Sequence, residues 1–233
     1  MIPLTDDNRR IAFPVLTLAL IGANAAVFIY EWTLPHEAQK ALFYSMAAIP
    51  AEYTRGMDVG AHTLHPVWLT LFTSMFLHGS WLHLLGNMLY LWIFGDNIEG
   101  LLGRVRFLIF YVVCGIAAML THSAVNPNSS VPALGASGAI AGVLGAYAVK
   151  YPGARVATLV IFFPFIRVVA VPALILLGFW FIYQVLIGTA SLVPGSEGAG
   201  VAWFAHIGGF VAGMILIVLL TPRRRRRTSW ASD

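Results

Sequence analysis

Long apolar stretches separated by polar loops predict a helical membrane protein with six spans. A helix that crosses the hydrocarbon core of a bilayer needs about 20 mostly apolar residues. We expect the spans at residues 11–32, 81 to 96 or 99, 107–123, 137–150, 172–192 and 201–220. The fourth has only about 14 residues, or roughly 20 Å of helix, whereas the core is roughly 30 Å thick. This helix is therefore expected to begin inside the membrane.

Three segments between the spans have other patterns. Residues 33–66 form a long mixed loop, expected on the extracytoplasmic side. Residues 68–76 are apolar at helical spacing but too short to span, which favours an interfacial or re-entrant element. Residues 153–171 are β-branched and aromatic but are interrupted by Pro164 and Arg167, which favours a cytoplasmic hairpin or surface loop. The expected fold is an all-α bundle of six helices with a long first loop.

The composition excludes a soluble globular domain. Hydrophobic residues make up 59% of the 233 residues and charged residues only 10%, and the mean hydropathy is +0.80. A soluble domain carries about 25% charged residues. The single cysteine, Cys114, excludes an internal disulfide, and its apolar neighbours indicate a place in the core.

Lysine and arginine residues predict the orientation, because they accumulate in cytoplasmic loops. With six spans, only Lys40 and Arg55 fall on the side opposite the two termini, both in the first loop. We therefore expect both termini in the cytoplasm. The expected organisation is a tail of residues 1–10, a membrane domain of residues 11–220 and a basic tail of residues 221–233.

The basic tail contains five consecutive arginines, Arg223–Arg227, which account for the net charge of +4. Such a run is expected to lie against anionic lipid. Nothing aromatic or folded accompanies it, so nucleic acid is not an expected partner. No signal-peptide cleavage site follows the first apolar stretch, which is expected to stay as a span. The expected location is a cell membrane, that of a prokaryote.

Four polar residues stand out inside the apolar spans: His83 and Asn87 in the second, Ser137 at the start of the fourth and His206 in the sixth. Ionisable groups in a bilayer are costly and are candidates for function. Each of the three spans places its polar residue roughly 20 to 25 Å from its cytoplasmic end, at about 1.5 Å per residue. One shared site is the simplest interpretation.

The residue types suggest acyl-transfer chemistry. Ser137 is the one candidate oxygen nucleophile, and His206 can act as its general base. An oxyanion formed by attack on a carbonyl needs preset donors. The backbone N–H of Ser137 at a helix start can be one, and His83 and Asn87, four residues apart on one helical face, can be others. No acidic residue lies at this depth, so the sequence predicts a dyad.

Small residues predict that the fourth and sixth spans pack closely. Gly138 and Gly142 share one face of the fourth span, and Gly209 and Gly213 share one face of the sixth. Glycines at this spacing usually form helix-packing faces in membranes. This packing would bring Ser137 toward His206.

Several features also have purely structural interpretations. A glycine-flanked serine arises easily in a chain with 22 glycines, and a lone buried histidine is usually a satisfied hydrogen-bonding group. His78, near the break before the second span, is either structural or near the site. His36, His62 and His65 are expected to be loop residues, and neither a metal site nor a cofactor is expected.

Three motifs, in this order along the chain, are similar to those of the rhomboid intramembrane serine proteases. They are His83-x-x-x-Asn87, Gly135-Ala136-Ser137-Gly138, and Ala205-His206-Ile207-Gly208-Gly209-Phe210 with Gly213. Arg104 and the long first loop resemble the family as well. The resemblance implies that Ser137 is the nucleophile, His206 the base, and His83 with Asn87 the oxyanion donors.

The resemblance also implies the substrates: transmembrane helices of other proteins, cut near the outer face at small residues. Some family members carry an aromatic residue four positions after the serine, packed on the histidine, but this chain has Ala141 there. What orients His206 is therefore left open. A non-catalytic rhomboid-like protein that binds and escorts membrane clients is the main alternative. A transporter is a third, although no inverted repeat or charged pathway is visible.

Overall fold

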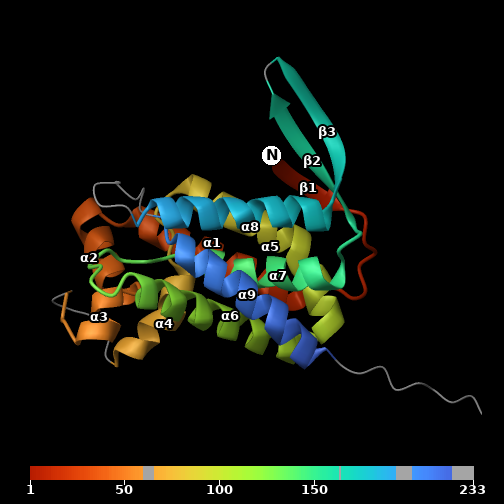
Figure 1. Ribbon diagram of the computed structural model, residues 1–233. Helices are drawn as coiled ribbons and strands as arrows, with labels where there is room; N and C mark the ends of the chain where they lie inside the picture. The colour runs from red at the N-terminus through yellow and green to blue at the C-terminus, as the bar shows by residue number, and fades with distance from the viewer. Residues whose placement is uncertain (60–65, 163, 193–200, 222–233) are drawn as a thin grey trace, which may run out of the picture.

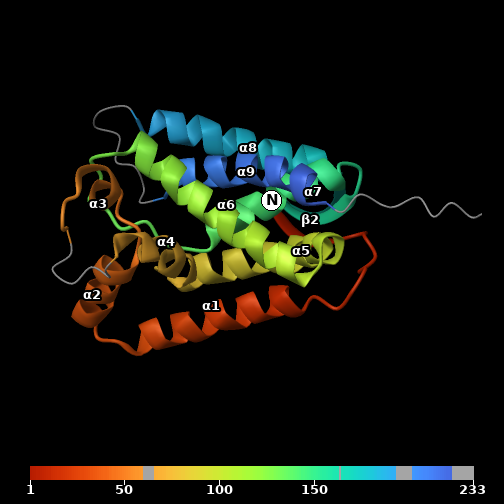
Figure 2. The ribbon, with the colours of Figure 1, turned by 90° about the horizontal axis from the view of Figure 1, so that it is seen from below.

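The computed structural model describes residues 1–59, 66–162, 164–192 and 201–221. Six long helices in this part of the chain lie side by side with their axes roughly parallel (Figures 1 and 2). They are α1 (Val15–Thr33), α5 (Trp81–Leu102), α6 (Arg104–Val125), α7 (Ser137–Lys150), α8 (Ala173–Ala190) and α9 (Trp203–Leu220). Each predicted span corresponds to one of these helices.

Four of the helices in the described residues are long and apolar enough to cross a membrane: α1, α6, α8 and α9. The short α7 has 14 residues. The last turns of α5 carry Asp96 and Glu99, which reduce its apolar character. The chain is therefore a membrane protein, and the total of six spans stays a prediction.

Prolines and glycines explain helix ends that differ from the predicted ones. Helix α1 begins at Val15 rather than at residue 11, because Pro14 precedes it and disfavours helical backbone in the residue before it. Helix α5 continues to Leu102, where Gly103 ends it with a φ of 75°. Gly103 also precedes α6, which therefore starts at Arg104, earlier than expected.

The short helix α7 begins and ends where the sequence predicts. It is enclosed by the other helices, because every residue from Gly138 to Ala148 is buried. The turn before it contains Pro132 and Gly135, and neither fits the interior of a helix. Non-helical backbone at membrane depth is tolerated where it is enclosed by protein or lines a cavity.

Helices α7 and α9 touch through backbone atoms. A Cβ atom on Gly209 would overlap the carbonyl oxygen of Gly138, and one on Gly213 would overlap the carbonyl oxygen of Gly142. A Cβ atom on Gly142 would also lie 2.5 Å from the Cβ and Sγ atoms of Cys114 in α6. Small residues let helix backbones approach this closely. The four glycines singled out from the sequence thus lie where α7 meets its neighbours.

Of the two alternatives for residues 153–171, a hairpin or a surface loop, the structure has the hairpin. Strands β2 (Arg155–Phe162) and β3 (Phe165–Pro172) pair antiparallel along their whole length. Strand β1 (Ile2–Asp6) pairs with the half of β2 nearest the bundle, which gives a sheet of order β1-β2-β3. Residues 2–6 of the segment expected as an N-terminal tail therefore form a strand. The predicted basic tail, with Arg223–Arg227, lies outside the described residues.

The long first loop is partly helical at the end of the bundle opposite the hairpin (Figure 1). Its described part contains α2 (His36–Met46) and α3 (Pro50–Arg55). The element expected at residues 68–76 is not one regular helix but three short turns, η1 (Val67–Leu69), α4 (Thr70–Thr73) and η2 (Ser74–Phe76). Thr73 Oγ1 donates to the Met46 carbonyl at 2.6 Å, which fastens these turns to α2.

Candidate active site

The structure brings Ser137 and His206 into direct contact. The Nε2 atom of His206 lies 2.8 Å from the Oγ atom of Ser137. Ser137 is the first residue of α7, and His206 lies in the first turn of α9. The glycine contacts between these helices allow two side chains from different spans to meet at hydrogen-bonding distance.

Gly135 shapes the turn that leads into Ser137. Its φ is 120°, a backbone conformation that side chains with a Cβ rarely adopt. Its N–H donates to the Ser74 carbonyl at 2.8 Å, which fixes the turn against η2. A Cβ atom here would lie 2.7 Å from the Cε1 and Nε2 atoms of His83. Glycine therefore lets the imidazole of His83 reach the start of α7.

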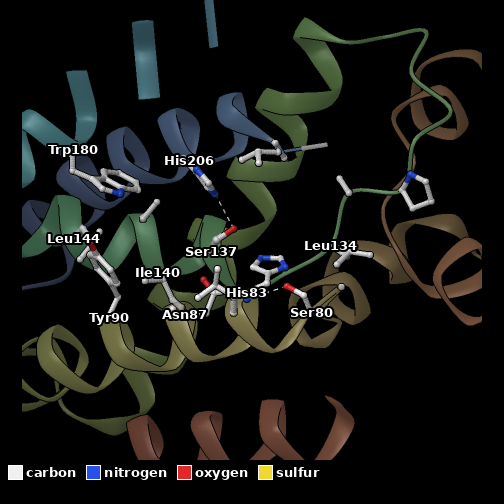
Figure 3. Close-up of a pocket in the computed structure, with 18 residues that line it drawn as sticks. Ser80, His83, Asn87, Tyr90, Leu134, Ser137, Ile140, Leu144, Trp180 and His206 are labelled. Carbon is white, nitrogen blue, oxygen red and sulfur yellow. Dashed lines mark hydrogen bonds between the residues drawn. The ribbon is translucent and has the colours of Figure 1, made fainter. Parts of the chain in front are cut away.

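The four predicted polar residues line one cavity of about 630 Å³. Figure 3 shows Ser137 between His206 on one side and His83 with Asn87 on the other. Apolar side chains form most of the remaining wall, among them Tyr90, Leu134, Ile140, Leu144 and Trp180. The first-turn N–H groups of a helix have no partner within the helix, so those at the start of α7 are candidate donors beside the Ser137 hydroxyl. The site combines a hydroxyl, an imidazole and several donors in an apolar pocket.

Asn87 is held by His78. The Nδ2 atom of Asn87 lies 3.0 Å from the Nε2 atom of His78. An amide nitrogen only donates, so Nε2 of His78 accepts, while its Nδ1 lies 3.2 Å from the Phe76 carbonyl and donates. The backbone N–H of His78 donates to Glu31 Oε2 at 3.2 Å. His78 is thus a buried partner of Asn87 and does not itself line the cavity.

The far side of His206 has a partner that the sequence reasoning missed. The Oε1 atom of Gln184, in α8, lies 2.8 Å from His206 Nδ1. Trp180, one turn away in the same helix, has its ring centre 5.8 Å from the imidazole centre. Ala141, four positions after Ser137, lines the cavity. Its methyl group extends less far than the aromatic ring that some family members carry at this position. The sequence does contain a feature that could have indicated this partner, because Gln184 is a polar residue within the apolar fifth span.

His36, the one loop histidine among the described residues, does not line this cavity. His36 begins α2, and its Nδ1 atom lies 3.5 Å from Glu37 Oε1. His62 and His65 fall outside the described residues. No group of three or more metal-ligating side chains occurs in the described ranges.

Comparison with known proteins supports the relationship that the motifs indicate. Residues 65–223 match the family model of the rhomboid domain, which is more than half of the chain. The chain belongs to the rhomboid family. The match includes the segments that carry Ser137, His206, His83 and Asn87.

Individual rhomboid relatives come from mitochondria and bacteria. The chain is 30% identical over 210 residues to "Rhomboid protein 1, mitochondrial" of Saccharomyces cerevisiae, covering 86% of this chain and 51% of that protein. It is 32% identical over 213 residues to "Presenilin-associated rhomboid-like protein, mitochondrial" of Bos taurus, covering 91% and 48%. It is 33% identical over 121 residues to "Putative rhomboid protease YdcA" of Bacillus subtilis, covering 51% and 60%. The chain spans about half the length of the mitochondrial relatives.

Proposed function

We propose that this rhomboid-family chain is a serine endopeptidase that hydrolyses peptide bonds in transmembrane segments of other membrane proteins. The observation that carries the proposal is the 2.8 Å hydrogen bond between Ser137 Oγ and His206 Nε2. The hydroxyl needs an adjacent base to become a nucleophile, and the imidazole is in place to take its proton. A histidine whose other nitrogen is hydrogen-bonded matches the general arrangement of hydrolytic dyads and triads.

The reaction follows from these positions. Ser137 Oγ bonds to the carbonyl carbon of the scissile peptide while its proton moves to His206 Nε2. The carbonyl oxygen becomes an oxyanion, for which the Ser137 backbone N–H and the side chains of His83 and Asn87 are the proposed donors. The carbon–nitrogen bond then breaks, and the departing amine takes the proton from His206. Water hydrolyses the resulting ester by the same steps in reverse, and the scheme needs no cofactor.

The surroundings of the dyad fit a substrate that arrives from the bilayer. The cavity wall is mostly apolar, so an apolar peptide segment suits it better than a charged one. The proposed topology has six spans and both termini in the cytoplasm, within the plasma membrane of a prokaryote. The names of two relatives given above assign those proteins to mitochondria.

A serine-directed fluorophosphonate probe tests the proposal. We expect the probe to label the wild-type protein in membranes and to leave Ser137→Ala unlabelled. Co-reconstitution with a panel of single-span membrane proteins should yield cleavage products that also depend on Ser137. A protein that only binds and escorts membrane clients would retain the panel without cutting it and would not react with the probe.

A further inference from the structure

Gln184 contacts the ring nitrogen of His206 that faces away from Ser137. Its Oε1 atom lies 2.8 Å from Nδ1, and the residue is only 4% exposed. An amide oxygen accepts and cannot donate, which places the ring proton on Nδ1. The Nε2 atom of the neutral imidazole is then unprotonated and faces the Ser137 hydroxyl. This is the tautomer that a general base requires.

We propose that Gln184 is the positioning residue of the general base, a role that rests on the proposed function. The rings of Trp180 and Trp203 lie beside His206, with ring centres 5.8 Å and 6.3 Å away. Ring packing restricts the plane of an imidazole but cannot distinguish its two nitrogens. The hydrogen bond from Nδ1 to Gln184 makes that distinction and fixes the orientation of the ring.

A neutral amide suits this depth better than a carboxylate. An ionised acid within a span is costly unless it is paired, and no acidic side chain contacts His206 among the described residues. Gln184 supplies an acceptor oxygen without a permanent charge. Gln184 therefore takes the position that the acidic third member has in a catalytic triad. The reacting groups are still the predicted dyad, Ser137 and His206.

Two variants of Gln184 test the role through kinetics. Gln184→Leu removes the acceptor and should lower kcat about tenfold to a hundredfold with little change in KM. Gln184→Glu keeps an oxygen in place and should recover most of kcat. Its carboxylate stabilises the protonated imidazole, so the acid limb of its pH–rate profile should move to higher pH. Thr189→Val is the control, because that hydroxyl donates to carbonyls of its own helix, at Val185 and Leu186.

Nitrogen-15 NMR of labelled histidine provides a readout that does not depend on turnover. In wild-type and Ser137→Ala protein, the His206 signals should show a protonated Nδ1 and an unprotonated Nε2, and Gln184→Leu should give a mixture of tautomers. An unchanged tautomer and kcat in Gln184→Leu would overturn the positioning role. Equal losses of kcat in Gln184→Leu and Gln184→Glu would also overturn it, as would an acid limb that does not move in the pH–rate profile of Gln184→Glu. Cleavage that persists in Ser137→Ala would instead overturn the proposed function, and the tautomer measurement would still test separately whether Gln184 sets the protonation of His206.

A separate observation concerns the outer half of the hairpin. The base of β2 is anchored, since Val156 and Thr158 are fully buried. Farther out the apolar side chains have no cover: Ile161, Phe165, Ile166 and Val168 are 59%, 60%, 66% and 59% exposed. They lie on both faces of the ribbon. A two-stranded ribbon with two exposed apolar faces is not stable in water by itself, so something covers it.

The position of the hairpin indicates what covers these apolar side chains. Figure 1 shows it standing out sideways from the bundle, across the helix direction, at the end where α8 begins. Strand β3 runs directly into α8, whose outer residues Leu174, Ile175 and Phe179 are also exposed and apolar. Because α8 is one of the candidate spans, its apolar outer face meets lipid tails. The hairpin continues this surface along the plane of the membrane.

We propose that the outer half of the β2–β3 hairpin lies in the membrane interface beside the bundle. Its outer strand, β3, has no further strand beside it in the described residues, so its free backbone groups cannot enter the hydrocarbon core. At the headgroup level, water and lipid headgroups satisfy them while the apolar side chains dip toward the tails. Arg167, in the exposed strand, and Arg155, at the base, are placed to contact anionic headgroups.

Site-directed spin labelling in liposomes with anionic lipid tests this placement. In a Cys114→Ala background, labels at Ile166→Cys and Val168→Cys should collide more often with oxygen than with a water-soluble nickel chelate. Ile175→Cys on α8 is the lipid control, and Ala38→Cys on α2 is the water control. Nickel collisions as frequent as at residue 38 would place the hairpin in water and overturn the proposal. Low collision rates with both reagents would mean a protein contact, such as a second copy, and would overturn it as well.

Discussion

The Cβ position of Gly135 lies 2.7 Å from the Nε2 atom of His83. This close approach joins the turn before the nucleophile to the side chain that we propose as an oxyanion donor. Real Cβ atoms essentially never come this close to another heavy atom. The residue two positions before Ser137 therefore sets the space available to His83.

Gly135→Ala should abolish or strongly reduce labelling of Ser137 by the fluorophosphonate probe. The methyl group would displace the His83 ring, and the φ of 120° would add strain of about 1–3 kcal/mol for a residue with a Cβ. Gly56→Ala is the matched control, because Gly56 has a φ of 62° but nothing within 4 Å of its Cβ position. It should lower stability slightly and leave labelling unchanged. Normal labelling of Gly135→Ala would show that His83 needs no such proximity.

Ser137→Ala and His206→Ala should each abolish substrate cleavage without unfolding the protein. The two side chains act as one unit, so the double variant should be no less active than either single one. Activity is measured with a reconstituted single-span substrate, and folding by thermal unfolding in detergent micelles. Near-normal turnover by either single variant would remove the dyad mechanism.

Asn87→Ala should lower kcat about tenfold to a thousandfold, as expected for loss of one oxyanion donor among several. The variant also leaves His78 Nε2 without its buried partner, so some loss of stability is expected. Stability and kcat must therefore be measured together. If Asn87→Ala is destabilised but turns over substrate at the wild-type rate, the role of Asn87 is structural.

The sequence was most informative where local chemistry decides the structure. The bounds of α7 follow from a proline, a glycine and a run of small residues, and these act within a few positions of each other. The polar residues of three spans could be aligned by depth because the membrane fixes the length scale. Glycine spacing then predicted which helix faces meet.

Features that depend on distant partners could not be predicted. Strand β1 exists because residues 2–6 pair with β2, far away in the chain, and its own short pattern gives no signal. Gln184 is one polar residue in a span, and only the folded arrangement shows that it faces His206. The turns at residues 67–76 depart from a regular helix where Thr70 and Thr73 bond to residues of the loop before them.

The contact between Gly142 and Cys114 leads to a compensating pair of changes. Gly142→Ala should destabilise the protein by about 1–3 kcal/mol, because its Cβ would meet Cys114 atoms 2.5 Å away inside a closely packed core. Movement of α7 would also disturb the hydrogen bond between Ser137 and His206, so probe labelling should slow. Cys114→Gly removes both opposing atoms and should restore part of the loss when the two changes are combined. Gly178→Ala, in α8 with nothing within 4 Å, is the control and should be neutral or slightly stabilising. Thermal unfolding of the wild type, the two single variants and the double variant gives the coupling free energy between residues 142 and 114. Strictly additive effects would show that α6 does not limit the position of α7.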